Sequence, residues 1–222
     1  MNRIALFLNS SVGRKLLMGL TGFFLCSFLT VHLTINLFLL KQDEGATFDA
    51  YAEFMATYPL VRPLEIVLFA GFLLHMVIGV WLWWTNRRVR DTRYAVNRAS
   101  DTSALSSRIM FITGAIMLAF LIVHVNAFFV SSRFFDPGKT MYELVRDAFA
   151  NPWTDALYLA AFVVLGYHLR HGFQSAFQTF GLRVPRYAKL IDAIGIIFWL
   201  LIPLAFACIP LYFLWNHSSG GN

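Results

Sequence analysis

Residues 164–174 read VLGYHLRHGFQ and put His168, Arg170 and His171 near the end of a segment, residues 152–178, that is otherwise almost entirely apolar. Ionisable side chains are costly inside a lipid bilayer, and those that occur there generally face the interior of a helix bundle and serve its function. We therefore expect this segment to be a membrane-spanning helix that binds a ligand or moves charge.

The composition of the 222-residue chain supports a membrane location. It is 58% hydrophobic, only 14% charged, contains 23 phenylalanines and has a mean hydropathy of +0.62. A soluble domain of this length has no core large enough for so much apolar surface, so we expect one membrane domain over residues 1–222. Cys26 and Cys208 lie inside apolar runs and form no C-x-x-C-H or C-x-x-C motif, which excludes covalent haem attachment by such a motif.

Five segments are long enough to cross a bilayer, which takes about 20 apolar residues. They comprise residues 16–40, 62–85, 109–130, 152–178 and 193–215. The fold class that follows is an all-α integral membrane protein with five transmembrane helices in a bundle. Two long connections, residues 41–61 and 131–151, each contain a short amphipathic segment that predicts a surface helix. No internal repeat is evident in the sequence.

Charge sets the orientation of this bundle, because Lys and Arg are enriched on the cytoplasmic side of membrane proteins. The side that holds the N-terminus and the loops after the second and fourth spans carries 13 of the 18 Lys and Arg residues but three of the 12 acids. We therefore expect a cytoplasmic N-terminus and a multi-pass protein of the cell inner (cytoplasmic) membrane. The net charge of +6 is attributed to this topology and not to nucleic-acid binding.

Four of the six histidines lie at two matched depths. With a rise of 1.5 Å per residue, His32 and His124 lie roughly 24 and 25 Å from the inner ends of their helices. His75 and His168 lie roughly 16 and 15 Å from theirs. A lone buried histidine is equally well explained by a bond to a backbone carbonyl, but pairs from different helices are typical of six-coordinate haem iron. The pattern predicts two haem b groups, with iron bound by His32 and His124 and by His75 and His168.

Glycines near the inner histidines leave room for a flat ring. Gly71 and Gly79 flank His75 by four residues on either side. Gly172 follows His168 at the same spacing. Residues four apart share one face of a helix, so these glycines are expected on the face where a porphyrin lies.

Two polar neighbours of His168 have more than one explanation. Arg170 and His171 lie further toward the cytoplasm, where they are candidate contacts of haem propionates. Snorkelling to the membrane surface is the alternative explanation for Arg170. His171 is the one rival of His168 as an iron ligand.

The order of these motifs resembles the cytochrome b membrane-anchor subunit of succinate:quinone oxidoreductases and fumarate reductases, in its single-chain, five-helix, di-haem form. The stretches that carry the resemblance are SVGRK (11–15), VHLTIN (31–36), LLHMVIG (73–79), SSRIMFITGAIMLAFLIVH (106–124) and YHLRHGFQSAFQTFG (167–181). Together they cover nearly the whole chain in order.

The resemblance implies partners and cofactors. The inner histidines would bind the proximal haem and the outer histidines the distal haem, and the family's ligand, a histidine followed by x-x-x-Gly, matches His168 better than His171. The family subunit anchors an iron–sulfur subunit and an FAD flavoprotein subunit on the cytoplasmic side and exchanges electrons with a quinone, for which the di-haem form favours menaquinone. The chain has no dinucleotide fingerprint, phosphate loop or cluster-binding cysteines, so succinate chemistry is assigned to these partners.

One position departs from part of the family. Some relatives carry a glutamate two residues before the inner ligand of the fourth span, in a proposed proton path across the membrane. This chain has Gly166 there. A proton pathway by that route is therefore not expected.

Acidic residues on the outer side are candidates for a quinone site, because quinone reduction takes protons as well as electrons. Glu65 stands at the start of the second span, and Glu53 lies in the preceding loop. Solvation at a helix end is the alternative explanation for both. A site near the cytoplasmic side is the other possible arrangement. In it, propionates, quinone or a docked subunit are contacted by four basic residues, Arg14, Lys15, Arg108 and Arg183, for which the enrichment of basic residues on the cytoplasmic side is the alternative explanation.

Two other kinds of protein remain open. The haem b anchor of another quinone-linked dehydrogenase or of a hydrogenase shares the histidine pattern. A proton-coupled transporter that uses membrane histidines as a relay binds no haem and tolerates unmatched depths. Such transporters often show broken helices in paired halves, and the prolines of the last span, Pro203 and Pro210, have no such counterpart.

Overall fold

The computed structural model of the chain describes residues 10–88 and 102–219, and every regular element within them is helical. The elements are α2 (Ser11–Asn36), η1 (Leu37–Leu40), α3 (Ala46–Thr57), α4 (Val61–Arg88), α5 (Thr102–Val125), η2 (Asn126–Phe135), α6 (Met141–Ala148), α7 (Pro152–Thr179), α8 (Pro185–Ile196), η3 (Ile197–Leu201) and α9 (Ile202–Ser218). Each η segment continues a neighbouring α-helix, η1 as a tighter turn and η2 and η3 as wider, π-helical ones. The predicted all-α class is confirmed.

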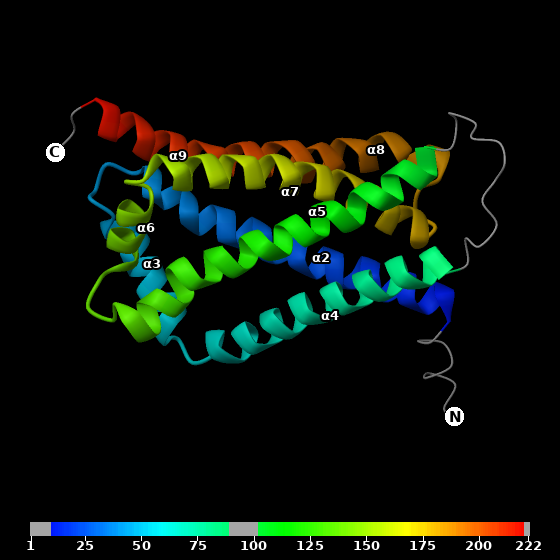
Figure 1. The fold of residues 1–222 in the computed structure, drawn as a ribbon, viewed down its shortest axis with the longest axis horizontal. Helices are drawn as coiled ribbons and strands as arrows, with labels where there is room; N and C mark the ends of the chain where they lie inside the picture. Colours follow the sequence, from blue (N-terminus) through cyan, green and yellow to red (C-terminus); the bar gives the residue numbers. More distant parts are fainter. Residues whose placement is uncertain (1–9, 89–101, 220–222) are drawn as a thin grey trace.

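The long helices form a bundle that runs along the horizontal axis of Figure 1. α2 packs against α4 and α7, and α7 also packs against α5 and α9. We call the end with the start of α2, the end of α4 and α8 the inner end, because the distribution of Lys and Arg predicts that it faces the cytoplasm. The opposite end, at the left of Figure 1, carries α3 and α6 and is called the outer end.

The described residues contain four helices that are long and apolar enough to span a membrane. They are Ser11–Leu40, Val61–Arg88, Ile109–Phe135 and Pro185–Ser218. The fifth predicted span, α7, meets the same standard only together with α6, from which it is bent by 96°. α7 is 28 residues long and packs among the other helices, and its polar residues near His168 explain its lower hydropathy.

The predicted spans differ from the helices at their ends. α2 begins five residues before the predicted span, because the Ser10 side chain accepts a hydrogen bond from the Gly13 N–H at 3.0 Å and caps the helix. α8 begins at Pro185, where proline suits the first turn, so the last helix starts well before residue 193. Hydropathy detects the apolar middle of a helix and misses its polar first turns.

Two short helices close the outer end, as the amphipathic loop segments predict. α3 and α6 are joined by a hydrogen bond from the Tyr142 N–H to the Asp49 carboxylate at 2.8 Å. Thr140 and Glu143 form a reciprocal capping box at the start of α6. Beneath them, buried Phe149 belongs to an apolar core with residues of α2, α7 and α9. The outer end of the bundle therefore has a packed cover.

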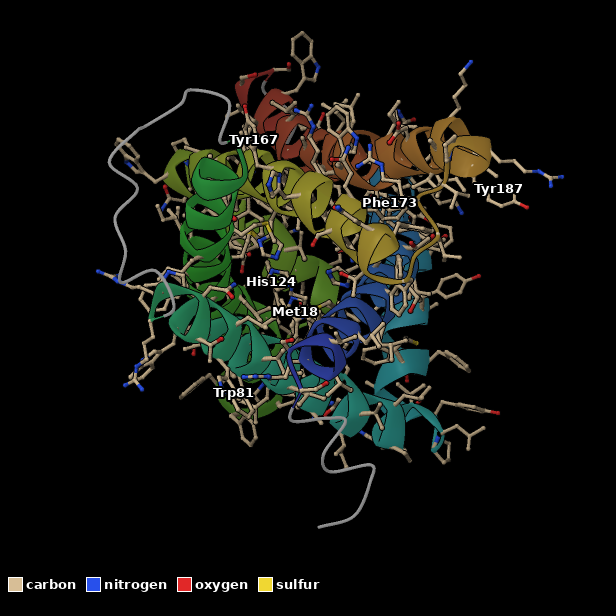
Figure 2. All side chains as sticks on the ribbon, turned by 90° about the vertical axis from the view of Figure 1, so that its right-hand side faces the viewer. Met18, Trp81, His124, Tyr167, Phe173 and Tyr187 are labelled. Carbon is tan, nitrogen blue, oxygen red and sulfur yellow. The ribbon has the colours of Figure 1, made fainter. Side chains whose placement is uncertain are left out.

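The bundle turns apolar side chains outward, as a protein surrounded by lipid does. Trp81 and Tyr187 are 44% and 46% exposed, and Figure 2, viewed from the inner end, shows both at the periphery. Met18 and His124 lie toward the middle of the bundle in the same view. Polar imidazoles inside and indole rings outside are the arrangement expected of a membrane protein with an internal site.

α7 and the last helix approach each other closely at Gly166. A Cβ atom at Gly166 would lie 2.8 Å from the backbone oxygen of Trp199. Trp199 stands four residues before Pro203, which has no N–H to bond that oxygen, and η3 widens at this point. A glutamate at position 166, as in some relatives of the resembled family, has no room in this packing.

Candidate functional site

The structure brings the four predicted histidines together as two facing pairs. The ring centres of His32 on α2 and His124 on α5, the outer pair, lie 5.8 Å apart with the ring planes at 89°. The ring centres of His75 on α4 and His168 on α7, the inner pair, lie 6.4 Å apart with the planes at 66°. These are the pairs that the matched depths predict, and each draws its rings from two different helices.

Both spacings fit one metal ion between two imidazoles. A metal–imidazole bond is about 2 Å long, so two rings that share an ion have centres roughly 6 Å apart. Within residues 10–88 and 102–219, no three or more His, Cys, Asp or Glu side chains converge as a metal site. Each pair offers two nitrogen donors, which suits iron in a porphyrin and falls short of a four-coordinate zinc site.

In the inner pair, a threonine hydroxyl lies within hydrogen-bond distance of one ring nitrogen of each histidine. Thr21 Oγ1 lies 3.0 Å from His75 Nδ1. Thr113 Oγ1 lies 3.2 Å from His168 Nδ1. Each hydroxyl already donates its proton to backbone carbonyls of its own helix at 2.9 to 3.1 Å. In the tautomer with hydrogen on Nδ1, each hydroxyl accepts from Nδ1–H, and the Nε2 lone pair of the histidine is available to a metal.

The outer pair has less uniform partners. His124 Nδ1 lies 3.1 Å from the hydroxyl of Tyr158, a buried residue of α7. His32 Nδ1 lies 3.4 Å from the side-chain nitrogen of Asn36, which also donates to the His32 carbonyl at 2.8 Å. The Tyr158 phenol both donates and accepts, like the threonine hydroxyls of the inner pair. The Asn36 nitrogen only donates, so its contact at 3.4 Å makes His32 Nδ1 the acceptor, and the outer pair does not repeat the inner arrangement.

The structure reveals an internal repeat that the sequence analysis misses. Met-x-x-Thr-Gly-x9-His occurs at residues 18–32 and 110–124, and His-x-x-x-Gly at residues 75–79 and 168–172. α2 with α4 and α5 with α7 are thus two copies of one helix pair, and each histidine pair takes one ring from each copy. The expectation of no repeat is wrong, because the copies share a few positions scattered over long helices.

The contacts around the histidines repeat as well. A Cβ atom at Gly22 or Gly114 would lie 3.6 Å from Cε1 of the inner histidine in the same helix pair. Phe28 and Phe120 stack on the outer histidine four residues later, with ring centres 5.3 and 5.7 Å away. The repeat therefore extends from sequence positions to the packing of each ring.

The glycines predicted to border a porphyrin have other neighbours. A Cβ atom at Gly71 would lie 2.6 Å from the Phe24 ring, so this glycine serves the packing of α4 on α2. Gly79 and Gly172 face the methyl ends of the two repeat methionines, at 3.5 and 3.8 Å from a Cβ atom there. The glycines that face the imidazoles come from the neighbouring helix, which helical periodicity alone does not show.

Two arginines predicted as propionate contacts pack on indole rings. The Arg14 guanidinium lies 4.8 Å from the centre of the Trp81 ring on α4. The Arg170 guanidinium lies 5.2 Å from the centre of the Trp199 ring in η3, on a side of α7 that faces the last helix. Both therefore have aromatic partners near the inner end, and the structure does not place either against an inner histidine.

The remaining basic candidates are less constrained. Lys15 is exposed in the first turn of α2, and His171 is half-buried one turn beyond His168. The side chain of Arg108, in the first turns of α5, lies outside the described side chains. Their proposed contacts with propionates, quinone or a docked subunit stay predictions.

Glu65 lies at the outer start of α4 in an ion pair. Its carboxylate accepts two hydrogen bonds from the Arg133 guanidinium of η2, at 2.7 and 3.0 Å, and one from Arg62 at 3.3 Å. Arg133 itself lies 4.1 Å from the centre of the Phe129 ring. The bridge joins α4 to η2 at the outer end, so Glu65 is not a freely solvated helix-end residue.

The two acids predicted for a quinone site have different surroundings. Glu65 is half-buried and holds the position on α4 that Tyr158 holds on α7, ten residues before the inner histidine. Glu53 is exposed on α3. The repeat therefore matches Glu65, and not Glu53, with Tyr158, while the hydrogen bonds of Glu65 itself come from Arg133 and Arg62.

The side chains that bond the imidazoles were not predicted from the sequence. Thr21 and Thr113 each belong to a Thr-Gly dipeptide at a fixed spacing before an outer histidine, and this repeated dipeptide is the signal that would have found them. Tyr158 has no such signal, because its copy in the first helix pair is Glu65 and only the fold brings it to His124.

Comparison with known families supports these observations. The model of the succinate dehydrogenase/fumarate reductase transmembrane subunit family matches residues 84–204, more than half of the chain. The match includes the helices that carry His124 and His168. No curated protein and no solved structure gives a significant match. The chain belongs to the family of succinate dehydrogenase/fumarate reductase transmembrane subunits.

Proposed function

We propose that the chain is a di-haem b subunit that passes electrons between an iron–sulfur subunit and a membrane quinone. Its family makes it a multi-pass membrane subunit of a succinate dehydrogenase or fumarate reductase complex, whose soluble subunits carry out the dicarboxylate chemistry. The observation that carries the proposal is the facing of two histidine rings at each of two depths, with spacings that fit one iron each.

The two ends of the bundle have different proposed roles in electron transfer. When bound, two haem b groups supply one-electron carriers, held by His75 and His168 on the inner side and by His32 and His124 on the outer side. The basic inner end suits the docking of the iron–sulfur subunit, which joins the FAD flavoprotein subunit to the cytoplasmic face of the inner membrane. Apolar helices around each pair keep water away from the ligands.

We place the quinone site at the outer end of α4, with menaquinone as the favoured substrate. The residues that bond the two inner histidines are the same in both helix pairs. Toward the outer end the two pairs differ, because α4 has Glu65 where α7 has Tyr158. The Arg133 fork holds the Glu65 carboxylate in its accepting, ionised form, so proton uptake by Glu65 requires that this fork open when quinone binds. A half-buried acid at the outer end of a span is a group that could exchange protons with a quinone.

The proposal is tested by a dithionite-reduced minus oxidised spectrum of the purified chain with its co-purifying subunits. Two b-type haems per chain are expected, together with bound flavin in the complex. One haem per chain would mean that one pair does not bind iron. A folded chain without haem would overturn the proposal and favour a proton-relay transporter.

The quinone site is tested by Glu65→Gln. This variant keeps the shape of the side chain but removes its proton-carrying group, so we expect quinone turnover to fall by about 100-fold, a typical contribution of general acid–base catalysis, while two haems per chain remain. Asp147→Asn, at an exposed acid of α6, serves as the control. Glu53→Gln separates the candidates, since a loss there and not at Glu65 would move the site to α3.

A further inference from the structure

The hydroxyl groups of the two repeat threonines have a role beyond packing. We propose that Thr21 and Thr113 are positioning residues of the inner haem site, which fix the Nδ1–H tautomer of the two inner histidines and set the reduction potential of that haem separately from the outer one. This inference rests on the proposed function, because it requires iron between the inner histidines.

Each threonine hydroxyl has one proton, and backbone carbonyl oxygens of its own helix lie within reach of it. Thr21 Oγ1 donates to the carbonyl oxygens of Leu17 and Met18, at 3.0 and 3.1 Å, and Thr113 Oγ1 donates in the same way within α5. With iron on Nε2, the one hydrogen of a neutral imidazole lies on Nδ1, which is 3.0 or 3.2 Å from the threonine oxygen. In that state the hydroxyl accepts from Nδ1–H and keeps its own bond to the backbone.

Burial of the two threonines favours the contact between each hydroxyl and Nδ1 over a contact with water. Thr21 is 9% exposed and Thr113 is 8% exposed, so water does not compete for either hydroxyl. A ring rotated away from the threonine would leave a buried polar atom without a partner, which costs about 1–3 kcal/mol. The preferred orientation of both inner imidazoles is thus the one that keeps Nδ1 at the threonine and turns Nε2 away from it.

The glycine after each threonine completes the arrangement. Gly22 and Gly114 lie beside Cε1 of the same imidazole, and a Cβ atom there would sit at 3.6 Å. One dipeptide therefore supplies a hydroxyl to the ring and leaves space beside its edge. Because it occurs in both helix pairs, two equivalent dipeptides serve the two inner ligands.

The electronic consequence follows from the direction of the hydrogen bond. Donation from Nδ1–H raises the basicity of a histidine ligand, and a more basic ligand favours oxidised over reduced iron. The outer pair has a phenol and a distant amide in place of these hydroxyls. Removal of a threonine hydroxyl is therefore expected to raise the potential of the inner haem and leave the outer one unchanged.

The experiment is a redox titration of the purified complex with Thr21→Val and with Thr113→Val. The inner haem is identified as the component that His168→Ala removes. Each valine variant is expected to shift the oxidised-to-reduced ratio of that haem by roughly three- to tenfold, which is about 28–59 mV upward for a one-electron couple. Loss of the inner haem alone would support the proposal equally, provided that serine restores it.

Two variants separate positioning from packing. Thr→Ser at either site keeps the hydroxyl and is expected to keep the wild-type potential. Thr30→Val removes a hydroxyl of α2 that bonds only the Cys26 carbonyl, at 3.0 Å, and is expected to change neither haem. Unchanged potentials in both valine variants, or equal shifts of both haems, would overturn the inference alone. A wild-type chain without haem would overturn the proposed function and this inference with it.

Discussion

Replacement of His168 by alanine is expected to remove one of two haems from the chain and to leave the other. The ring centres of His168 and His75 lie 6.4 Å apart, and Nδ1 of His168 lies 3.2 Å from the Thr113 hydroxyl. His168 is therefore the imidazole of α7 that shares a site with His75. The outer pair shares no ligand with the inner pair. Haem per chain, measured with a pyridine haemochrome assay and a protein determination, should fall from two to one.

His171→Ala is the matched control for this result. His171 lies on the same helix, three residues closer to the inner end, and its loss should leave both haems in place. His75→Ala should reproduce the loss seen with His168→Ala, because the two rings share one site. If His171→Ala loses a haem and His168→Ala retains both, the inner ligand has been wrongly assigned.

Replacement of Gly45 by alanine is expected to destabilise the outer cover more than a change at any exposed glycine. Gly45 has φ of +83°, a left-handed conformation that costs other residues about 1–2 kcal/mol. A Cβ atom there would also overlap the Tyr142 side chain, including its Cβ and Cγ atoms, which cannot swing away freely. Overpacking adds about 1–3 kcal/mol, so the unfolding midpoint in detergent should fall by roughly 10 °C.

Gly181→Ala separates the two contributions. Gly181 also has a positive φ, +69°, but nothing lies within 4 Å of a Cβ atom there, so its substitution carries the backbone cost alone. In a Tyr142→Gly background, which removes the clashing Cβ and Cγ atoms, Gly45→Ala should cost no more than Gly181→Ala. Equal midpoints for Gly45→Ala and Gly181→Ala in the unmodified chain would show that α3 and α6 are not packed as described.

The sequence determined the parts of the fold that depend on position along a single helix. Hydropathy located the five helices, and the rise per residue placed His32 level with His124 and His75 level with His168. Amphipathic loop segments predicted α3 and α6. These inferences succeed because depth in a membrane is one coordinate, fixed by the number of residues from a helix end.

The tertiary structure decided which side of each helix meets which neighbour. Thr21 and His75 are 54 residues apart, and Glu65 and Arg133 are 68 apart, so no local pattern relates them. The rotation of each helix about its axis and its choice of partner come from packing across the whole bundle. For the same reason, Arg170 lies over Trp199, although its place in the sequence, two residues from His168, suggested a haem contact.

The internal repeat depends on both the spacing of residues in the sequence and their contacts in the tertiary structure. Its spacing is present in the sequence, but the few shared positions stand among many that differ, and apolar residues exchange freely on lipid-facing surfaces. Only the matching contacts of Thr21 and Thr113 made the two helix pairs recognisable as copies. Sequence therefore fixed the depth of the ligands, and packing fixed the hydrogen bonds that orient them, because orientation depends on atoms that distant segments supply.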